Sequence, residues 1–228
     1  MTHIYPSAQG CEDRVLEGFR TQASATVHEA MGRRGAMDPE IKPLDRSMKV
    51  VGRALTVKCH PGDNVMLVKA ISMARKDDVI VLDMGGLRDI GPFGEVLATE
   101  CKRRGMGGLV FNCCVRDSEE IIRMGLPVFS AGLCIRGTVK ASLGTINHVI
   151  TCGGQIVRPG DLILGDADGV VVVPAEEAEA VLAASEARVR KEEDIIRRLL
   201  AGESAFDIYN YQPLMERLGC VEQKAEEE

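Results

Sequence analysis

The stretch VIVLDMGGLRDIGPFGEVLATECKRRGMGGLVFNCCVRDSEEIIRM, residues 79–124, decides the fold of this chain. Its first residues, 79–83, are a short apolar run that predicts a strand covered on both faces. A glycine-rich turn leads into a predicted helix at residues 95–104, which Gly105 ends. A second strand at residues 108–111 and a short helix from residue 115 to 124 repeat the pattern. This alternation of strands and helices indicates βα units and an α/β fold.

The segments before this stretch extend the same pattern. Residues 50–57 are rich in β-formers and stop at the turn-forming cluster HPGDN, residues 60–64, after which residues 65–71 are apolar enough for a buried helix. The opening of the chain predicts a helix pair, with Ser24 as the N-cap of the second helix and Gly35 as its end.

The segments after Gly125 change to short β runs, at residues 127–130, 138–139 and 148–150. Residues 161–164 and 170–173 flank an Asp-Gly turn, which predicts a hairpin in which Gly169 supplies a positive φ. Residues 174–200 predict a long, charged surface helix. We expect one domain over residues 1–228, with its core at about 24–174 and C-terminal helices at about 175–218.

Composition narrows the class of protein. A net charge of −6 and a pI near 5.4 argue against a nucleic-acid partner. The sequence has no run of 18 apolar residues, and its N-terminus has no basic and apolar signal segment, so we expect a cytoplasmic protein with no membrane partner. The eight cysteines show no zinc-ligand spacing, and we expect most of them to be buried as small apolar groups.

One region carries residue types suited to chemistry. Gly94 stands at the start of a predicted helix, whose free backbone N–H groups can hold a carboxylate. Twenty residues separate Glu95 from the pair Arg116-Asp117, which offers a fork-shaped cation and a hard oxygen ligand. Together these groups suit a small anionic substrate and a metal ion. Taken alone, an Arg-Asp pair is more often a surface ion pair or a helix cap.

A series of motifs resembles the RraA-like family, and within it the class II pyruvate aldolases that act on 4-hydroxy-4-methyl-2-oxoglutarate and 4-carboxy-4-hydroxy-2-oxoadipate. The resemblance covers roughly residues 24–209. The motifs are ATVHEA (25–30), PGDN (61–64), FGEVLAT (93–99), RGMGGLV (104–110), VRD (115–117), GTVK (137–140) and PGD (159–161). The resemblance implies an αββα sandwich with flanking N- and C-terminal helices. It also implies a homotrimer or homohexamer with active sites between subunits.

The resemblance also implies roles for individual residues. Asp117 would be the direct protein ligand of Mg²⁺ or Mn²⁺, and Glu95 and a neighbouring subunit's Glu192 would hold water on the metal. Glu193 is one position away from Glu192 and stays an alternative. The backbone amides of Val96 and Leu97 would receive the pyruvate carboxylate, Arg116 would contact the keto or enolate oxygen, and Asn64 would lie near the substrate. Gly94 and Glu95 are also implied to bind substrate.

The implied reaction is retro-aldol cleavage that releases pyruvate, with oxaloacetate decarboxylation as a second activity through the same enolate. Relatives often carry Asp where this chain has Glu95, which leaves the choice between the two substrates open. Cys113 and Cys114, just before Arg116, would pack or contribute to the site. The alternatives are a non-enzymatic regulator of the same fold that binds ribonuclease E, and an enzyme for another 2-oxo acid.

Overall fold

The structure of the chain is a computed structural model that describes residues 3–220. Two compact units divide the chain: the first ends at Ser185 and the second begins at Glu186. All strands of the described residues lie in the first unit. Within residues 3–220, no helix combines the length and the apolar character that crossing a bilayer requires.

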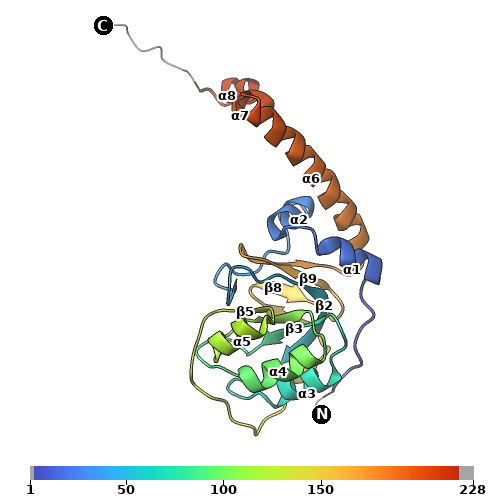
Figure 1. The fold of residues 1–228 in the computed structure, drawn as a ribbon, viewed down its shortest axis with the longest axis vertical. Helices are drawn as coiled ribbons and strands as arrows, with labels where there is room; N and C mark the ends of the chain where they lie inside the picture. Colours follow the sequence, from blue (N-terminus) through green and yellow to red (C-terminus); the bar gives the residue numbers. More distant parts are fainter. Residues whose placement is uncertain (1–2, 221–228) are drawn as a thin grey trace, which may run out of the picture. The chain divides into compact units, whose positions relative to one another are not determined.

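A mixed sheet forms the centre of the first unit (Figure 1). Its strands run in the order β1, β5, β4, β3, β2, β9, β10, and β6 pairs with the end of β2. Neighbours from β2 to β5 are parallel, whereas β1, β6, β9 and β10 pair antiparallel. The sheet strands are β1 (Lys42–Pro43), β2 (Val50–Lys58), β3 (Asp78–Asp83), β4 (Gly108–Phe111), β5 (Val128–Ser130), β6 (Thr145–Ile146), β9 (Leu162–Gly165) and β10 (Val170–Val173).

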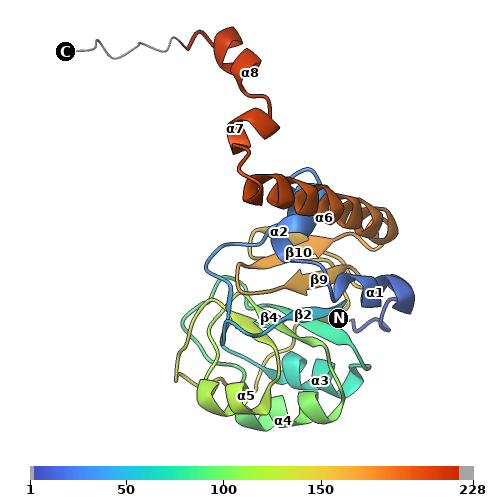
Figure 2. The same cartoon turned by 45° about the horizontal axis from the view of Figure 1, so that its top comes forward.

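Three helices connect the parallel strands: α3 (Val65–Met73), α4 (Glu95–Arg103) and α5 (Ser118–Met124). Strands β2 to β5 follow one another across the sheet without a reversal, so right-handed crossovers place all three helices on one face. Figure 1 and Figure 2 show the three helices side by side there.

Alternate residues of the central strands supply two separate cores. Ile80 and Leu82 of β3 pack in the cluster beneath α3, α4 and α5. Val79 and Val81 point the other way and pack with Ile150 of a small hairpin, β7 (Ile150–Cys152) and β8 (Gln155–Val157). All six residues of β3 are buried, so the apolar run of residues 79–83 is explained by burial on both faces.

A third cluster covers the antiparallel end of the sheet. Helices α1 (Asp13–Phe19) and α2 (Ser24–Ala30), with the first turns of α6 (Ala178–Leu200), pack there. The buried members include Phe19, Val27, Leu164, Val171 and Ala178.

The second unit contains the rest of α6 and two short helices, α7 (Ala205–Ile208) and α8 (Gln212–Arg217). The Ser204 hydroxyl caps α7 by accepting the Asp207 N–H at 3.1 Å. Large apolar side chains of this unit remain exposed, including Leu200 at 84% and Leu218 at 75%. Such exposure is expected of a segment that packs against another surface.

The prediction of an α/β fold with helices flanking the sheet is confirmed. Details of the second helix were wrong. Ala23, not Ser24, is the N-cap of α2, and both the N–H and the hydroxyl of Ser24 donate to Asp166 at 2.7 Å. The helix ends at Ala30 rather than at Gly35 because Gly32 and Arg33 already adopt left-handed backbone conformations.

Predictions for the later β runs were partly wrong. Residues 138–139 form no strand, and Val139 makes only an isolated bridge with Asp63. The run predicted at residues 148–150 begins at Ile150. The hairpin around Asp168-Gly169 is confirmed as β9–β10, but Gly169 has no positive φ; the Asp166 carboxylate holds the turn by accepting the Asp168 N–H at 3.0 Å.

Candidate active site

The predicted site residues of the first unit gather at one edge of the sheet, where the parallel strands end. Asn64 follows β2, the glycine-rich segment up to Gly94 follows β3, and Arg116-Asp117 follow β4. Open parallel sheets bind ligands at the carboxyl ends of their strands. Residues that are far apart in the sequence therefore meet on neighbouring loops.

Asp117 is positioned by the start of α4. Its Oδ2 accepts the Glu95 N–H at 3.0 Å. A Cβ atom on Gly94 would lie only 2.2 Å from this oxygen, so the close approach requires glycine. Asp117 is also the N-cap of α5, but its side chain makes no capping bond there, and its φ of 55° is left-handed. A non-glycine residue in this conformation carries strain that the surrounding structure must hold.

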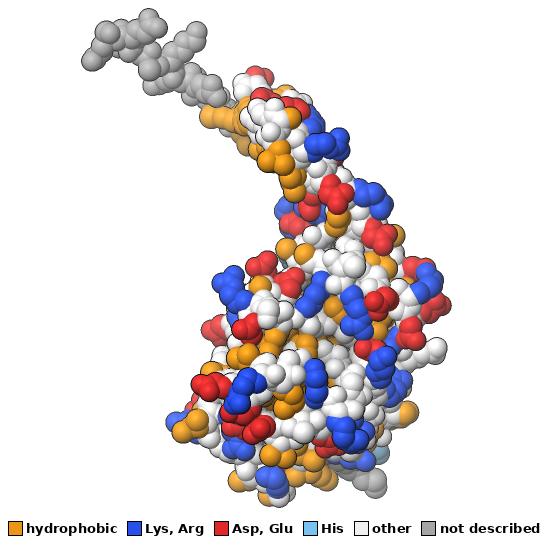
Figure 3. Space-filling model, in the orientation of Figure 1, with side chains coloured by type: hydrophobic (Ala, Val, Ile, Leu, Met, Phe, Trp, Pro, Cys, Tyr) orange, Lys and Arg blue, Asp and Glu red, His pale blue; other side chains and the backbone are white. Residues whose placement is uncertain are grey.

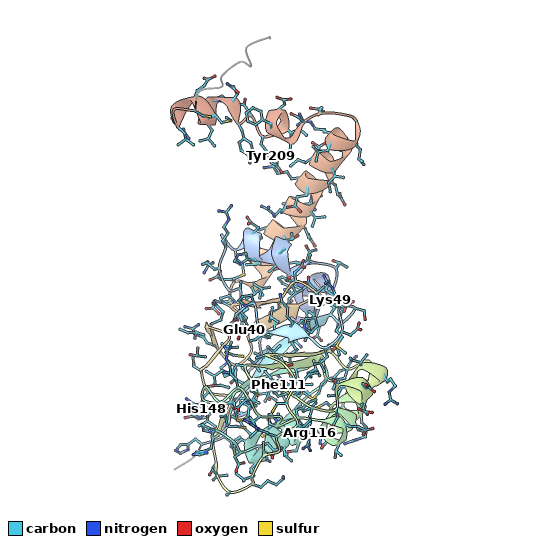
Figure 4. All side chains as sticks on the ribbon, turned by 90° about the vertical axis from the view of Figure 1, so that its left-hand side faces the viewer. Glu40, Lys49, Phe111, Arg116, His148 and Tyr209 are labelled. Carbon is cyan, nitrogen blue, oxygen red and sulfur yellow. The ribbon has the colours of Figure 1, made fainter. Side chains whose placement is uncertain are left out.

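Arg116 lies beside this carboxylate, beyond the end of β4, whose last residue Phe111 is labelled with it in Figure 4. Its backbone N–H donates to the Phe93 carbonyl at 3.0 Å, and its Nε lies 3.8 Å from Asp117 Oδ2. Both side chains are about half exposed, 45% for Arg116 and 41% for Asp117. The ion pair is therefore long and accessible to an added ligand.

A pocket of about 440 Å³ adjoins the pair. Residues 115–118 form one side of it, and Leu133, Cys134 and Ile135 form the other. The second group belongs to the segment after β5, so a fourth strand end contributes to the site. The sequence pointed to none of these three residues, because an apolar side chain in a loop carries no motif of its own.

The first turn of α4 brings backbone donors to the same place. The first N–H groups of a helix have no partner within it, which leaves those of Val96 and Leu97 available to a ligand. The Glu95 side chain is exposed, and so is Val96, at 82%. An anion bound at this helix terminus would have the Asp117 carboxylate and the Arg116 guanidinium as neighbours.

Asn64 is almost fully buried. Its Nδ2 donates to the Pro92 carbonyl at 2.8 Å, two residues before Gly94. Its Oδ1 has no hydrogen-bond partner among the described residues. In this structure, Asn64 holds the segment that leads into α4, and its predicted contact with substrate stays a prediction.

Glu192 lies on α6 within the second unit. It forms an ion pair with Arg188 at 2.8 Å. Its predicted reach to a neighbouring subunit stays a prediction, as does the choice between Glu192 and Glu193.

The donor set fits a divalent cation that keeps most of its ligands as water and substrate. Asp117 Oδ2 is engaged, whereas Oδ1 has no hydrogen-bond partner within residues 3–220. The same residues contain no group of three His, Cys, Asp or Glu side chains that could hold a metal by themselves. Mg²⁺ is commonly held by one or two carboxylates with water and substrate oxygens, and Asp117 with nearby Glu95 is such a set.

The cysteines next to the pair are of two kinds. Cys113 is fully buried, and burial raises the pKa of its thiol. Cys114 is half-buried, and burial also raises the pKa of its thiol, though it lies in a more open position. The expected packing role fits Cys113.

Comparison with known proteins identifies the family of the chain. A family model described as RraA-like, Aldolase/RraA, matches residues 24–172. A protein of Halalkalibacterium halodurans, provisionally named as a 4-hydroxy-4-methyl-2-oxoglutarate aldolase, is 35% identical over 193 residues, which cover 85% of this chain and 91% of that protein.

Two solved structures share the fold. An uncharacterised protein of Pseudomonas syringae pv. tomato superposes with a TM-score of 0.75 at 24% identity, covering 86% of this chain and 97% of the other. A Streptomyces coelicolor protein, described as an unusual member of the RNase ES inhibitor RraA protein family, gives a TM-score of 0.74 at 24% identity, with 82% and 97% covered. At this identity the likeness concerns the fold alone.

Proposed function

The chain belongs to the RraA-like family, and from that premise we propose that it is a cytoplasmic, divalent-metal-dependent carbon-carbon lyase. Its substrate is 4-hydroxy-4-methyl-2-oxoglutarate or 4-carboxy-4-hydroxy-2-oxoadipate, cleaved to pyruvate plus pyruvate or oxaloacetate. Decarboxylation of oxaloacetate is a second activity, and the reaction serves the catabolism of aromatic compounds. The observation that carries the proposal is the contact of Asp117 with the Glu95 N–H, beside Arg116 and the open end of α4.

Each group in this arrangement has a task in retro-aldol cleavage. The N–H groups of Val96 and Leu97 bind the substrate's C1 carboxylate at the helix terminus. Arg116 lies where negative charge develops on the C2 oxygen as the C3–C4 bond breaks, and a fixed cation there stabilises the enolate. Its position is set by the backbone bond to Phe93.

Asp117, with Glu95, would hold the Mg²⁺ or Mn²⁺ ion. When bound, the ion supplies Lewis-acid polarisation of the 2-oxo group. Glu95 orients a water that takes the C4 hydroxyl proton and returns it to C3 of the enolate to give pyruvate, and no lysine Schiff base is required. Glu192 of a neighbouring subunit would hold the same water.

Exposed apolar residues around the pocket support a homotrimer or homohexamer whose subunits meet at the site. Ile135 is 91% exposed, Leu133 59% and Val96 82%. Apolar side chains gathered in this way mark interaction surfaces. On the face of the first unit drawn in Figure 3, acidic and basic side chains are interspersed, which supports a small anionic substrate over a nucleic acid as partner.

The test is pyruvate formation coupled to lactate dehydrogenase, from 4-hydroxy-4-methyl-2-oxoglutarate and from oxaloacetate, with Mg²⁺, Mn²⁺ or EDTA. Because metal ions alone decarboxylate oxaloacetate, rates are taken over a protein-free control with the same ion. We expect EDTA-sensitive release from both substrates, abolished in Arg116→Ala and Asp117→Ala.

The matched control is Arg123→Ala, which removes an exposed arginine of α5 that pairs with Glu120 outside the pocket. It should keep wild-type rates. Release from oxaloacetate alone would keep the mechanism and point to another aldol substrate. No release with either metal would favour the regulator that binds ribonuclease E.

A further inference from the structure

The turn between β2 and α3 contains a buried carboxylate that the proposed chemistry does not use. Asp63 is only 1% exposed. Its Oδ1 accepts the Val65 N–H at 2.8 Å, and its Oδ2 accepts the N–H groups of Ala141 and Ser142 at 2.6 and 2.8 Å. Three backbone N–H groups thus donate to this carboxylate, and a charged group can be buried only when it is hydrogen-bonded in this way or paired with an opposite charge.

The electrostatics of Asp63 agree with a charged anchor. Burial alone would raise its pKa, but the hydrogen bonds from Ala141, Val65 and Ser142 outweigh burial and hold the pKa below its usual value. The carboxylate is therefore ionised at neutral pH. Bonds from N–H groups to an ionised acceptor are stronger than those to a neutral one.

The same turn contacts a second part of the site. The carbonyl of Gly62 accepts the Val139 N–H at 2.9 Å, which adds to the hold of Asp63 on the segment after β5. The neighbouring Asn64 holds the Pro92 carbonyl, before α4. The turn thus connects the segment that leads into α4 with the segment that contains the pocket wall.

The segment that contains this wall is irregular: residues 131–144, all described, contain no helix or strand, although they include Leu133, Cys134 and Ile135. The wall itself pairs with Val115, whose N–H donates to the Gly132 carbonyl at 3.1 Å and whose carbonyl accepts the Cys134 N–H at 2.9 Å. Further along, besides the bonds to the turn, the Gly91 N–H donates to the Arg136 carbonyl at 2.9 Å. A Cβ atom on Gly91 would lie 2.3 Å from the Cys134 carbonyl oxygen, so the two segments are in close contact.

We propose that Asp63 is a positioning residue of the active site: its carboxylate anchors the far end of the segment, residues 139–142, and so keeps the apolar wall, which pairs with Val115 at its near end, in place beside Arg116 and Asp117. The catalytic part of this inference rests on the proposed function, whereas the anchoring does not. Asp63 touches neither substrate nor metal in this scheme. It acts through the backbone that it holds.

The test compares Asp63→Asn with a matched control, Asp161→Asn. An amide offers only one acceptor oxygen, and this neutral oxygen accepts more weakly than a carboxylate oxygen, so the first variant loses the bonds of one oxygen and weakens the rest. Asp161 is also buried, at 2% exposure, and accepts two backbone N–H groups, of Arg158 at 2.8 Å and Ala175 at 3.1 Å, in a turn outside the pocket. Because burial raises the pKa of Asp161, whereas hydrogen bonds lower that of Asp63, the control should lose less thermal stability than Asp63→Asn.

Anchoring is measured by trypsin cleavage of the native protein, because Arg136 and Lys140 lie within the anchored segment. Mass spectrometry follows the new N-termini at Gly137 and Ala141. We expect these cuts to appear at least tenfold faster in Asp63→Asn and at the wild-type rate in Asp161→Asn. In parallel, kcat/KM for pyruvate release should fall about tenfold or more in Asp63→Asn alone, since a misplacement near 1 Å costs about 100-fold.

The outcomes separate the two proposals. Cleavage at the wild-type rate in Asp63→Asn would overturn the anchor, whether or not the protein is an aldolase. Faster cleavage with the same kcat/KM as Asp161→Asn would overturn the positioning role. A wild-type protein that releases no pyruvate would count against the proposed function, because cleavage is read without substrate.

Amide hydrogen exchange in the wild-type protein keeps the proposal testable if Asp63→Asn does not fold. The amides of Val139, Ala141 and Ser142 should exchange slowly. Exchange as fast as that of an unstructured peptide would refute the anchor.

Discussion

Replacement of Gly94 by alanine would probe the contact on which the candidate site depends. The new Cβ would lie 2.2 Å from Asp117 Oδ2 and 3.1 Å from Arg116 Cγ. Since real Cβ contacts are not shorter than 3.0 Å, the carboxylate must move by about 0.8 Å. A shift close to 1 Å in a catalytic group costs about 100-fold in rate, or about 2.7 kcal/mol of transition-state stabilisation.

The assay is metal-dependent pyruvate release, with kcat and KM measured separately. The control is Gly169→Ala, in the β9–β10 turn, where a Cβ would meet only Lys42 Nζ at 4.0 Å and the glycine has no positive φ. We expect a fall of about 100-fold in kcat/KM for Gly94→Ala and no change for the control, with both proteins folded by circular dichroism. A Gly94→Ala protein with rates within a few-fold of wild type would refute the role of this close approach.

Three further predictions concern stability and the thiols. Phe111→Ala should lower the free energy of unfolding in urea by about 3–5 kcal/mol, because the ring is fully buried and packs against Phe93 in a tilted arrangement, with ring centroids 5.3 Å apart. A loss below about 1 kcal/mol would contradict this packing. Burial raises the pKa of Asp166, but hydrogen bonds from Ser24 and Asp168 outweigh burial and bring this pKa below its usual value. Stability from this group is therefore present above the unfolded pKa and lost as pH falls through the folded pKa. Ser24→Ala should lower the free energy of unfolding by about 1 kcal/mol at pH 7. It should also reduce the loss of stability that the wild-type protein shows as pH falls from about 5 to 2. An unchanged dependence of stability on pH would exclude a contribution from the Ser24–Asp166 contact. With Ellman's reagent, the native protein should react only at its more exposed thiols, which are Cys114, Cys134 and Cys220. The other thiols should react only after unfolding, because they are buried and burial raises the pKa of such thiols, that of Cys152 to about 12. Fast labelling of all eight thiols in the native protein would contradict that burial.

The parallel strands β2 to β5 and their three covering helices were predictable from residues 50–130 because strand burial and helix periodicity are local signals. The middle of the buried strand β3, residues 79–82, is an apolar run, and Gly105 follows the end of α4 as a helix terminator. The pair Arg116-Asp117 became a candidate site through the resemblance to the RraA-like family, since an Arg-Asp pair taken alone is more often a surface ion pair or a helix cap.

What the sequence did not reveal depends on contacts between distant segments. Ser24 looked like a helix cap, but Asp166, far along the chain, takes both its N–H and its hydroxyl. Gly169 looked necessary for a positive φ, yet a carboxylate holds that turn instead. Asp63 followed Gly62 at a strand end, a signal of a turn only, and its bonds to residues 141 and 142 appear once the chain is folded.

The left-handed backbone at Asp117 has a consequence for protein engineering. A φ of 55° at a non-glycine residue stores on the order of 1 kcal/mol, which glycine at this position would release. A library screened for heat resistance alone would therefore favour replacement of the proposed metal ligand, since strain at active sites opposes stability. Thermostable variants should be selected for turnover at the same time, or this position should be held fixed.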